Sequence, residues 1–426
     1  MARSPSPYSR ASWNSLGPVA RQLISVRFLR SIAQGALAVD FTLYLGARHW
    51  TAPEIGLLLM GGGLLGALLS LIVGVTSDRL GRKGFLLGYE TGLVLGTGAV
   101  AAYPATWVIA LVAALFGFGR GANGSSGPFA PAEQAWLAQS LPDARRGTVF
   151  SLNAGLQFWG MGIGSLLAAV LPHMIPGASG ASAYLPLFLL NLVIAVVNLG
   201  QIWLLQETPP GKAAPEQPVT PSAVRSEESV TRRENRALAS LTVVNMVNAL
   251  GVGLIAPLLP YWFSVKFGVG PEAIGPVYAL TFFLTGASSL VIGRISERVG
   301  LIRAIVLPRT VGVLLLVAIP FMPSFTLAAV LYVLRSVLNR GSMGARQAFS
   351  VGLVRDRRRG LASSLNALSW GLPAAIGPAV GGWLIGAGEL VLPFVAASLL
   401  QLGYVVLFPA VMGRYEARPA RAQDSA

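Results

Sequence analysis

The chain has 426 residues, of which 54% are hydrophobic and 12% are charged, and its formal net charge at pH 7 is +15. Soluble globular proteins carry about 25% charged residues, so the charged fraction is about half of the usual value. Apolar runs of about 20 residues, long enough to cross a bilayer, recur along the chain. This composition excludes an ordinary soluble protein and indicates an all-α integral membrane protein that crosses the lipid bilayer many times.

The residue types exclude several kinds of chemistry. The chain has no Cys, which excludes disulfides and thiol nucleophiles, and its two His are too few for a histidine metal cluster. We therefore expect no metal and no cofactor. A nucleophile elbow and an ATP-binding phosphate loop are also missing from the sequence, so neither an enzyme nor an ATP-driven pump is expected. The positive charge fits loops on the cytoplasmic side of a membrane, and we expect no nucleic-acid partner.

In chain order, residues 1–23 lack the apolar segment of a signal peptide and are predicted to be a cytoplasmic tail. Six apolar segments follow and are predicted to form an N-terminal six-helix bundle over 24–205, with helices at 24–47, 54–76, 84–104, 106–127, 148–171 and 182–205.

Residues 206–236 are rich in Pro, Ser and charged residues and are predicted to be a flexible cytoplasmic linker. A second bundle is predicted over 237–413, with helices at 237–262, 272–293, 303–321, 325–345, 361–386 and 389–413. The seventh of these twelve helices contains Pro257 and Pro260, where we expect it to bend. Residues 414–426 are predicted to be a second cytoplasmic tail.

The distribution of Lys and Arg predicts the orientation. With both termini in the cytoplasm, the inside segments hold 23 of these residues, whereas the outside loops hold only Arg48 and Lys266. Because positive residues are enriched on the cytoplasmic side, this alternation supports twelve spans. It predicts a multi-pass protein of the plasma (inner) membrane.

The two halves of the chain resemble each other. With an offset of 219 residues, Gly74, Asp78 and Gly81 coincide with Gly293, Glu297 and Gly300, and with an offset of 213 the segment "QAWLAQSLPDARRGTVFSLN" (134–153) matches "QAFSVGLVRDRRRGLASSLN" (347–366). Matches at two separate loops indicate a duplicated six-helix unit. Such parallel repeats occur in transporters that move one half against the other.

The segment "GVTSDRLGRK" (74–83) resembles the signature loop between the second and third helices of the major facilitator superfamily. The resemblance extends over nearly the whole chain and implies twelve helices in two pseudo-symmetric bundles. It also implies a cytoplasmic latch that holds the halves together while the substrate site faces outward. The latch residues are then Gly74, Asp78, Arg79, Gly81, Arg82, Lys83, Glu297 and Arg298.

Helix termini supply a physical reason for such a latch. An acid can accept hydrogen bonds from the free N–H groups at the start of a helix. By pseudo-symmetry, we expect Asp78 to face the helix that begins near 360–364 and Glu297 to face the one that begins near 147–148. The alternative is that these charges only fix the topology, which explains Arg82 and Lys83 well but leaves the acid at both repeat positions unexplained.

Ionisable residues inside the membrane are functional candidates. Asp40 lies in the middle of the first predicted helix, and exporters of the superfamily often carry an acid in this helix. We therefore predict a role in proton coupling or substrate contact for Asp40, the alternative being a structural ion pair. Further proton-coupling candidates are Arg120 and Glu90, the repeat partner of which is Arg309.

Several other charged residues are expected to have structural roles. We predict that Arg27 and Arg30 are interface anchors at the start of the first helix and that Glu133, Arg340 and Arg346 are structural residues near the cytoplasmic face. The first and seventh helices usually line the cavity in this family, and the fifth and eleventh contribute polar residues. The predicted substrate-cavity residues are Gln34, Asp40, Tyr44, Asn153, Gln157, Asn245, Asn248, Tyr261, Asn366 and Trp370.

These features predict a secondary active transporter that moves a small organic solute by alternating access, as a monomer, with protons as the coupling ion and export as the direction. The fifth helix lacks the proline of the usual antiporter motif, and "GPAVGG" (377–382) lies in the eleventh helix instead. One alternative is therefore a proton-coupled uptake symporter for a metabolite. Another is a non-transporting membrane receptor with the same fold.

Overall fold

The computed structural model describes residues 16–119, 130–207, 221–343, 346, 349–350, 353–354 and 359–415. Within these ranges, side chains are described except at 74–75, 78–80, 143–148, 221–229, 289–299, 301 and 359–364. The described residues form helices joined by short turns, which confirms the all-α fold predicted from the composition.

The helices of the N-terminal half are α1 (Pro18–Ala47), α2 (Ala52–Leu80), α3 (Arg82–Ala102), α4 (Thr106–Phe116), α5 (Ala130–Gln139), α6 (Asp143–Val170) and α7 (Leu185–Leu204). Two short 3₁₀ helices, η3 (Leu171–His173) and η4 (Gly180–Tyr184), join α6 to α7. The α1–α2 turn is tight because Thr51 and Glu54 form a capping box, in which the Glu54 carboxylate accepts a hydrogen bond from the Thr51 N–H at 2.7 Å.

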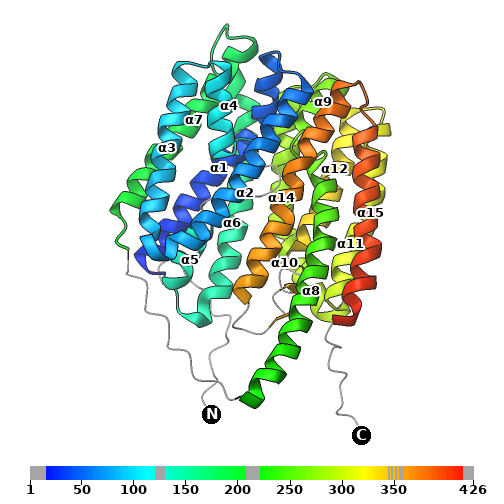
Figure 1. Cartoon of the computed structure of the whole chain (residues 1–426). Coiled ribbons are helices and arrows are strands. Elements are labelled where there is room, and N and C mark those ends of the chain that lie inside the picture. Colours follow the sequence, from blue (N-terminus) through cyan, green and yellow to red (C-terminus); the bar gives the residue numbers. More distant parts are fainter. Residues whose placement is uncertain are drawn as a thin grey trace, which may run out of the picture.

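The helices of the C-terminal half are α8 (Pro221–Gly253), α9 (Leu259–Phe267), α10 (Pro271–Val299), α11 (Leu301–Ala318), α12 (Phe325–Gly341), α14 (Arg359–Gly386) and α15 (Leu392–Met412). The 3₁₀ helices η5 (Ile319–Phe321) and η7 (Gly413–Tyr415) follow α11 and α15. Figure 1 shows the two halves side by side, with α1–α7 on the left and α8–α15 on the right.

Three elements differ from the prediction. The fourth expected helix ends early, at Phe116, and α5 begins at Ala130 in a segment expected to be a loop. The expected linker is helical from Pro221 onward, so α8 is longer than the predicted span at its start. The seventh expected helix, in contrast, bends as predicted at Pro257, in a turn over 254–258 that separates α8 from α9, whereas Pro260 lies within the first turn of α9.

Eight helices in the described part of the chain are long and apolar enough to cross a membrane. They are α2, α3, α6, α7, α8, α11, α14 and α15, with η3, η4, η5 and η7 extending four of them. The remaining expected spans correspond to α1, α4, α10 and α12. Of these, α1 has 30 residues but carries four charged side chains, at Arg21, Arg27, Arg30 and Asp40.

The halves meet along two helix pairs, α2 with α14 and α6 with α10. We call the end of the molecule with the α1–α2 turn the outer end, following the orientation expected from Lys and Arg. The largest apolar core lies toward this end and contains side chains of both halves, such as Phe41 and Phe188 with Trp262 and Phe394. One shared core therefore joins the halves at the outer end.

At the inner end each half has a separate core. One core contains Leu23, Trp136 and Ile202 of the N-terminal half, and another contains Ile305 and Phe408 of the C-terminal half. The two halves are therefore packed together at one end of the molecule and packed independently at the other.

The distance between α2 and α14 also increases from the outer end of the molecule to the inner end. A Cβ added at Gly386, near the outer end of α14, would lie 2.6 Å from Cδ of Pro53, so only glycine fits there. Farther inward, a Cβ at Gly371 would lie 3.8 Å from the Ala67 Cβ, an ordinary contact. The two helices thus diverge from the outer end toward the inner end.

Candidate functional site

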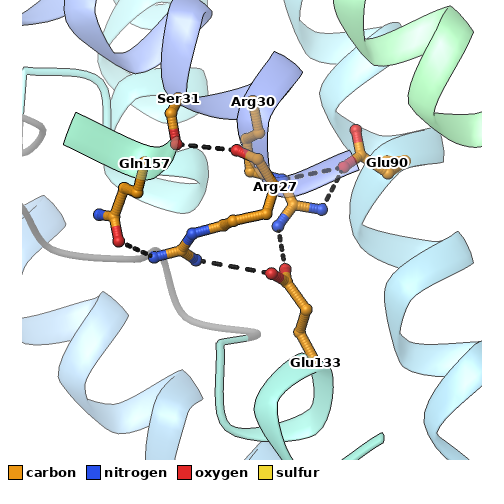
Figure 2. A network of polar contacts seen from close by, with 6 residues as sticks. All are labelled: Arg27, Arg30, Ser31, Glu90, Glu133 and Gln157. Carbon is orange, nitrogen blue, oxygen red and sulfur yellow. Dashed lines mark hydrogen bonds and ion pairs between the residues drawn. The ribbon is translucent and has the colours of Figure 1, made fainter. Parts of the chain in front are cut away.

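A buried polar cluster lies within the N-terminal half (Figure 2). Arg27 and Arg30 are three residues apart, so they project from the same side of α1. The Arg30 guanidinium contacts two carboxylates, Glu90 of α3 at 2.6 Å and Glu133 of α5 at 2.5 Å. Arg27 lies 3.8 Å from Glu133 and donates a hydrogen bond to the Gln157 amide oxygen at 2.7 Å. Four helices are thereby joined by one network.

The charges of this cluster are balanced, with two arginines facing two glutamates. All four side chains are buried, and Glu90 is 0% exposed. Asn198 of α7 lies beside Glu90. Burial of a charge is costly unless the charge is paired and hydrogen-bonded, and this arrangement meets both conditions.

The burial corrects the expectation for two residues. Arg27 and Arg30 were predicted to be interface anchors, but each is only 3% exposed and binds acids inside the half. Their partners come from α3 and α5, which lie far away in the sequence, and this is why the arginines alone did not reveal the cluster.

Asp40 lies on α1 ten residues beyond Arg30, about 15 Å along the helix axis, in the outer half of the molecule. Its side chain is 0% exposed, and neither carboxylate oxygen has a hydrogen-bond partner among the described residues. Two ionisable groups lie close enough to interact electrostatically with the Asp40 carboxylate. They are Glu272 at the start of α10 and Tyr184 of η4. The alternative role for Asp40, a structural ion pair, is not supported, because Asp40 forms no ion pair with an arginine in the described part of the chain.

The C-terminal half contains a polar cluster of different composition. Asn245 of α8 donates hydrogen bonds to the Asn366 amide oxygen at 2.9 Å and to the Ser369 hydroxyl at 3.3 Å, both on α14. One turn farther along α8, the Asn248 amide oxygen accepts a hydrogen bond from Arg309 of α11 at 2.6 Å. The cluster therefore joins three helices through amides and one arginine.

Three further arginines of this half lie against aromatic rings or amides. Arg335 donates a hydrogen bond to the Gln401 amide oxygen at 3.1 Å. The guanidinium carbon of Arg346 lies 4.9 Å from the centre of the Trp370 ring, and that of Arg340 lies 5.0 Å from the Phe282 ring. Arg309 is also stacked on Tyr404, at 4.7 Å. Ring faces attract these cations by their quadrupole.

The other predicted cavity residues are dispersed. Tyr44 packs inside the N-terminal half, against the rings of Tyr184 and Phe188 at 5.9 and 4.9 Å. Tyr261 of α9 lies against Gly46 of α1, at the contact between the halves. The remaining two, which are partly exposed, are Gln34 on α1 and Asn153 on α6.

The signature loop is described only in part. The structure does not describe the side chains of four latch residues, which are Asp78, Arg79, Glu297 and Arg298. Arg120 also lies outside the described residues. The contacts expected for these five residues therefore stay predictions. Gly81 has a φ of 91° between α2 and α3, a conformation that favours glycine.

Lys83 and Glu207 connect this loop to the end of α7. The Glu207 carboxylate accepts hydrogen bonds from the backbone N–H groups of Arg82 and Lys83 at 2.5 and 3.1 Å, so it caps the start of α3. The Lys83 ammonium donates to the carbonyl oxygens of Trp203 and Leu205 at 2.8 and 2.6 Å. In this structure Lys83 therefore binds its own half rather than the opposite one.

Sequence reasoning placed Glu133 and Arg346 among structural residues and did not relate them to each other. The offset of 213 residues makes them repeat partners, as the offset of 219 does for Glu90 and Arg309. Opposite charges at two pairs of repeat positions were the signal that could have identified both clusters. Among the described residues, no group of three His, Cys, Asp or Glu is arranged to hold a metal ion.

Comparisons with known proteins agree with this architecture. The sequence model of the Major Facilitator Superfamily matches residues 23–244 and again residues 241–425, so each half is matched separately. The chain is 24% identical over 358 residues to the uncharacterized membrane protein YJR124C of Saccharomyces cerevisiae, covering 78% of this chain and 80% of that protein. It is 27% identical over 398 residues to the multidrug resistance protein MdtH of Enterobacter sp. (strain 638), covering 90% and 87%.

A solved structure shares the fold. It is a bacterial homolog of the human lysosomal transporter Spinster in an inward-facing and occupied conformation, with a TM-score of 0.71, 14% sequence identity, and coverage of 94% of this chain and 98% of that one. The duplicated match of the family model accounts for the two helical halves and identifies a transporter rather than an enzyme. This chain belongs to the Major Facilitator Superfamily.

Proposed function

We propose that the protein is a secondary active transporter that exports a small organic solute in exchange for protons, by alternating access between its two halves. The arrangement of the apolar cores supports alternating access. One shared core joins the halves at the outer end, and separate cores at the inner end let the halves move apart there without exposing either core.

The observation that carries proton coupling is the environment of Asp40. This carboxylate is fully buried and has no hydrogen-bond partner among the described residues, which makes its anionic form costly, and intramembrane acids of this kind are candidate proton carriers. The nearby acid Glu272 belongs to the other half, so movement between the halves changes the electrostatic environment of Asp40. Glu90 is a weaker candidate because Arg30 holds it in an ion pair.

Export is favoured by one comparison. The relative MdtH is named a multidrug resistance protein, and the alignment covers 90% of this chain. Insertion in the inner membrane with cytoplasmic termini is part of the same proposal and rests on the distribution of Lys and Arg. Function as a monomer is also part of the proposal.

The test uses purified protein in proteoliposomes with an imposed pH gradient and a panel of organic solutes. An antiporter accumulates solute on the acidic side of the membrane, whereas a symporter accumulates it on the alkaline side, so the two gradient directions distinguish export coupling from the uptake alternative. We expect accumulation on the acidic side by the wild type. We expect Asp40→Asn to lose gradient-driven accumulation about tenfold or more while it still exchanges solute without a gradient.

Glu389→Gln is the matched control, because Glu389 is an exposed acid in the α14–α15 turn and should leave coupling unchanged. If Asp40→Asn accumulated solute as well as the wild type, Asp40 would have no coupling role. If no solute moved in either gradient direction, the transport proposal itself would fail.

A further inference from the structure

Each half contains a cluster of polar side chains, and at two pairs of repeat positions in these clusters an acid of the N-terminal half corresponds to an arginine of the C-terminal half. In the N-terminal half, Arg30 of the first helix binds Glu90 of the third helix (Figure 2). In the C-terminal half, Asn248 of α8 binds Arg309 of α11, and Arg309 is the repeat partner of Glu90. The arginine of this pair therefore lies on α11, and its partner on α8 is a neutral amide.

A second pair of positions shows the same exchange. Asn245 and Asn248 have the same three-residue spacing as Arg27 and Arg30, without being their repeat partners, and Asn245 binds Asn366 of α14, whereas Arg27 binds Gln157 of α6. Glu133, the acid shared by both arginines of the N-terminal half, has Arg346 as its repeat partner. Two acids of one half, Glu90 and Glu133, thus correspond to two arginines of the other, Arg309 and Arg346.

Among the described side chains, the C-terminal half has an excess of positive charge around Arg309. Arg309, Arg335 and Arg346 form no ion pair with a carboxylate among the side chains that the structure describes. They lie close enough for the charge of Arg309 to act on both Arg335 and Arg346. Like charges in a low-dielectric interior repel, and a ring face or a neutral amide compensates them less than a carboxylate does.

Two members of this group are partly exposed. Arg335 and Arg346 are both partly exposed, as is Trp370, the ring partner of Arg346, whereas Arg309 is 4% exposed. Trp370 adjoins Gly371, where α14 has begun to diverge from α2. Because Arg346 is stacked on Trp370, Arg346 is the partly exposed arginine that lies at the boundary between the halves, on the inner side of their shared core.

We propose that the C-terminal half binds the oxyanion group, a carboxylate or a phosphate, of an organic solute. Arg346 is the direct ligand because its planar guanidinium fits an oxyanion, and Arg309 and Arg335 supply positive charge behind it. Trp370 offers an apolar surface to the body of the solute. This substrate class rests on the proposed transport function and deepens it, since the bound anion supplies a counter-ion that Arg309, Arg335 and Arg346 lack among the described side chains.

The test compares aromatic probes of similar size and different charge, using the purified full-length protein in detergent. The probes are benzoate and phenyl phosphate as oxyanions, benzyl alcohol as a neutral compound and benzylamine as a cation. We expect benzoate or phenyl phosphate to raise the thermal unfolding midpoint in a saturable manner. We expect no saturable shift with benzyl alcohol or benzylamine at equal concentration.

Two variants and one control locate the site. Asn248→Asp introduces a carboxylate beside Arg309 and so supplies internally the counter-ion that the N-terminal half already has. Arg346→Gln removes the direct ligand. We expect each variant to weaken oxyanion binding about tenfold or more, the loss typical of a charged hydrogen bond. Arg414→Gln removes the same charge from an exposed position and should bind like the wild type.

Asn248→Asp keeps the test informative if Arg346→Gln does not fold, because it adds a favourable pair and removes no arginine. The proposal is wrong if benzylamine stabilises the protein as well as the oxyanions do, if neither oxyanion stabilises it, or if Asn248→Asp binds oxyanions normally. Transport of benzylamine with no binding of oxyanions would leave the transport function intact and exclude the anion site. Oxyanion binding without movement of any solute would exclude transport and retain the site.

Discussion

At the residue scale, the N-terminal cluster depends on Arg30, which is shared by two carboxylates. Glu90 and Glu133 approach this one guanidinium at 2.6 and 2.5 Å, and none of the three side chains is exposed to more than a few per cent. Each acid would be a buried charge without its main counter-ion if Arg30 were removed. The cluster therefore joins α1 to α3 and α5 only when Arg30 and both glutamates are present together.

We expect Arg30→Met to lower the free energy of unfolding by about 3–5 kcal/mol, because it leaves two buried carboxylates with a single arginine. The double variant Arg30→Met with Glu90→Leu should recover part of this loss, since it also removes one of the unmatched acids. The measurement is unfolding of the purified proteins in mixed detergent micelles. Equal stability of wild type and Arg30→Met would show that the cluster contributes nothing to the fold.

The sequence predicts the candidate residues better than it predicts their contacts. The position of Asp40 inside a span was enough to identify a candidate functional acid, but the sequence predicted contact with a cavity and not a side chain that is 0% exposed. The pairing of Arg30 with Glu90 and Glu133 joins positions 60 and 103 residues apart, and a single sequence does not contain that information. Opposite charges at repeat positions were visible, but their meaning required the three-dimensional contacts.

At the scale of helices, the start of α3 is stabilised by a side chain from the segment after α7. Glu207 accepts hydrogen bonds from two backbone N–H groups that have no partner within the helix. We expect Glu207→Ala to lower the free energy of unfolding by about 1 kcal/mol, the usual value of a lost helix cap. Gln206→Ala is the control because Gln206 is next to Glu207 in the sequence and its side chain is exposed. An equal loss of stability in both variants would contradict the capping role of Glu207.

The contact between α2 and α14 provides a second test at this scale. A Cβ at Gly382 would collide with the carbonyl oxygen of Ala52, whereas a Cβ at Gly371 would make an ordinary contact with Ala67. We therefore expect Gly382→Ala to cost about 1–3 kcal/mol and to slow transport, and Gly371→Ala to stay within about 0.5 kcal/mol of the wild type. Both are measured by unfolding and by solute exchange in proteoliposomes. A harmless Gly382→Ala would mean that the outer ends are not closely packed.

Most of the helices could be predicted from apolar runs, because a bilayer requires about 20 such residues wherever the chain crosses it. One exception is a segment whose local composition is not typical of the helix that it forms. The segment that forms the first turns of α8 contains Pro, Ser and several charges, which are typical of a linker, and yet it is helical. The turn between α8 and α9 was predicted correctly because proline restricts the backbone regardless of tertiary context.

At the scale of the whole molecule, the halves share one apolar core at the outer end and keep separate cores at the inner end. Alternating access requires a second arrangement in which the inner ends meet and the outer ends separate. That arrangement needs attractive contacts at the inner end, where the signature loop lies. The acids Asp78 and Glu297, which occupy equivalent places in the two repeats, are suited to bind the free N–H groups of helices in the opposite half.

We therefore expect Asp78→Asn to impair transport without impairing insertion or stability, because the amide is neutral and loses the charge that favours a helix N-terminus. Solute exchange in proteoliposomes should fall at least several-fold, while the unfolding midpoint of the described arrangement stays unchanged, since this arrangement is closed at the other end. Gln206→Ala serves as the control, because it changes an exposed, uncharged side chain near the same loop. Full exchange activity in a well-inserted Asp78→Asn would mean that the loop charges only set the topology, and the arrangement with closed inner ends would then need another source of attraction between the halves.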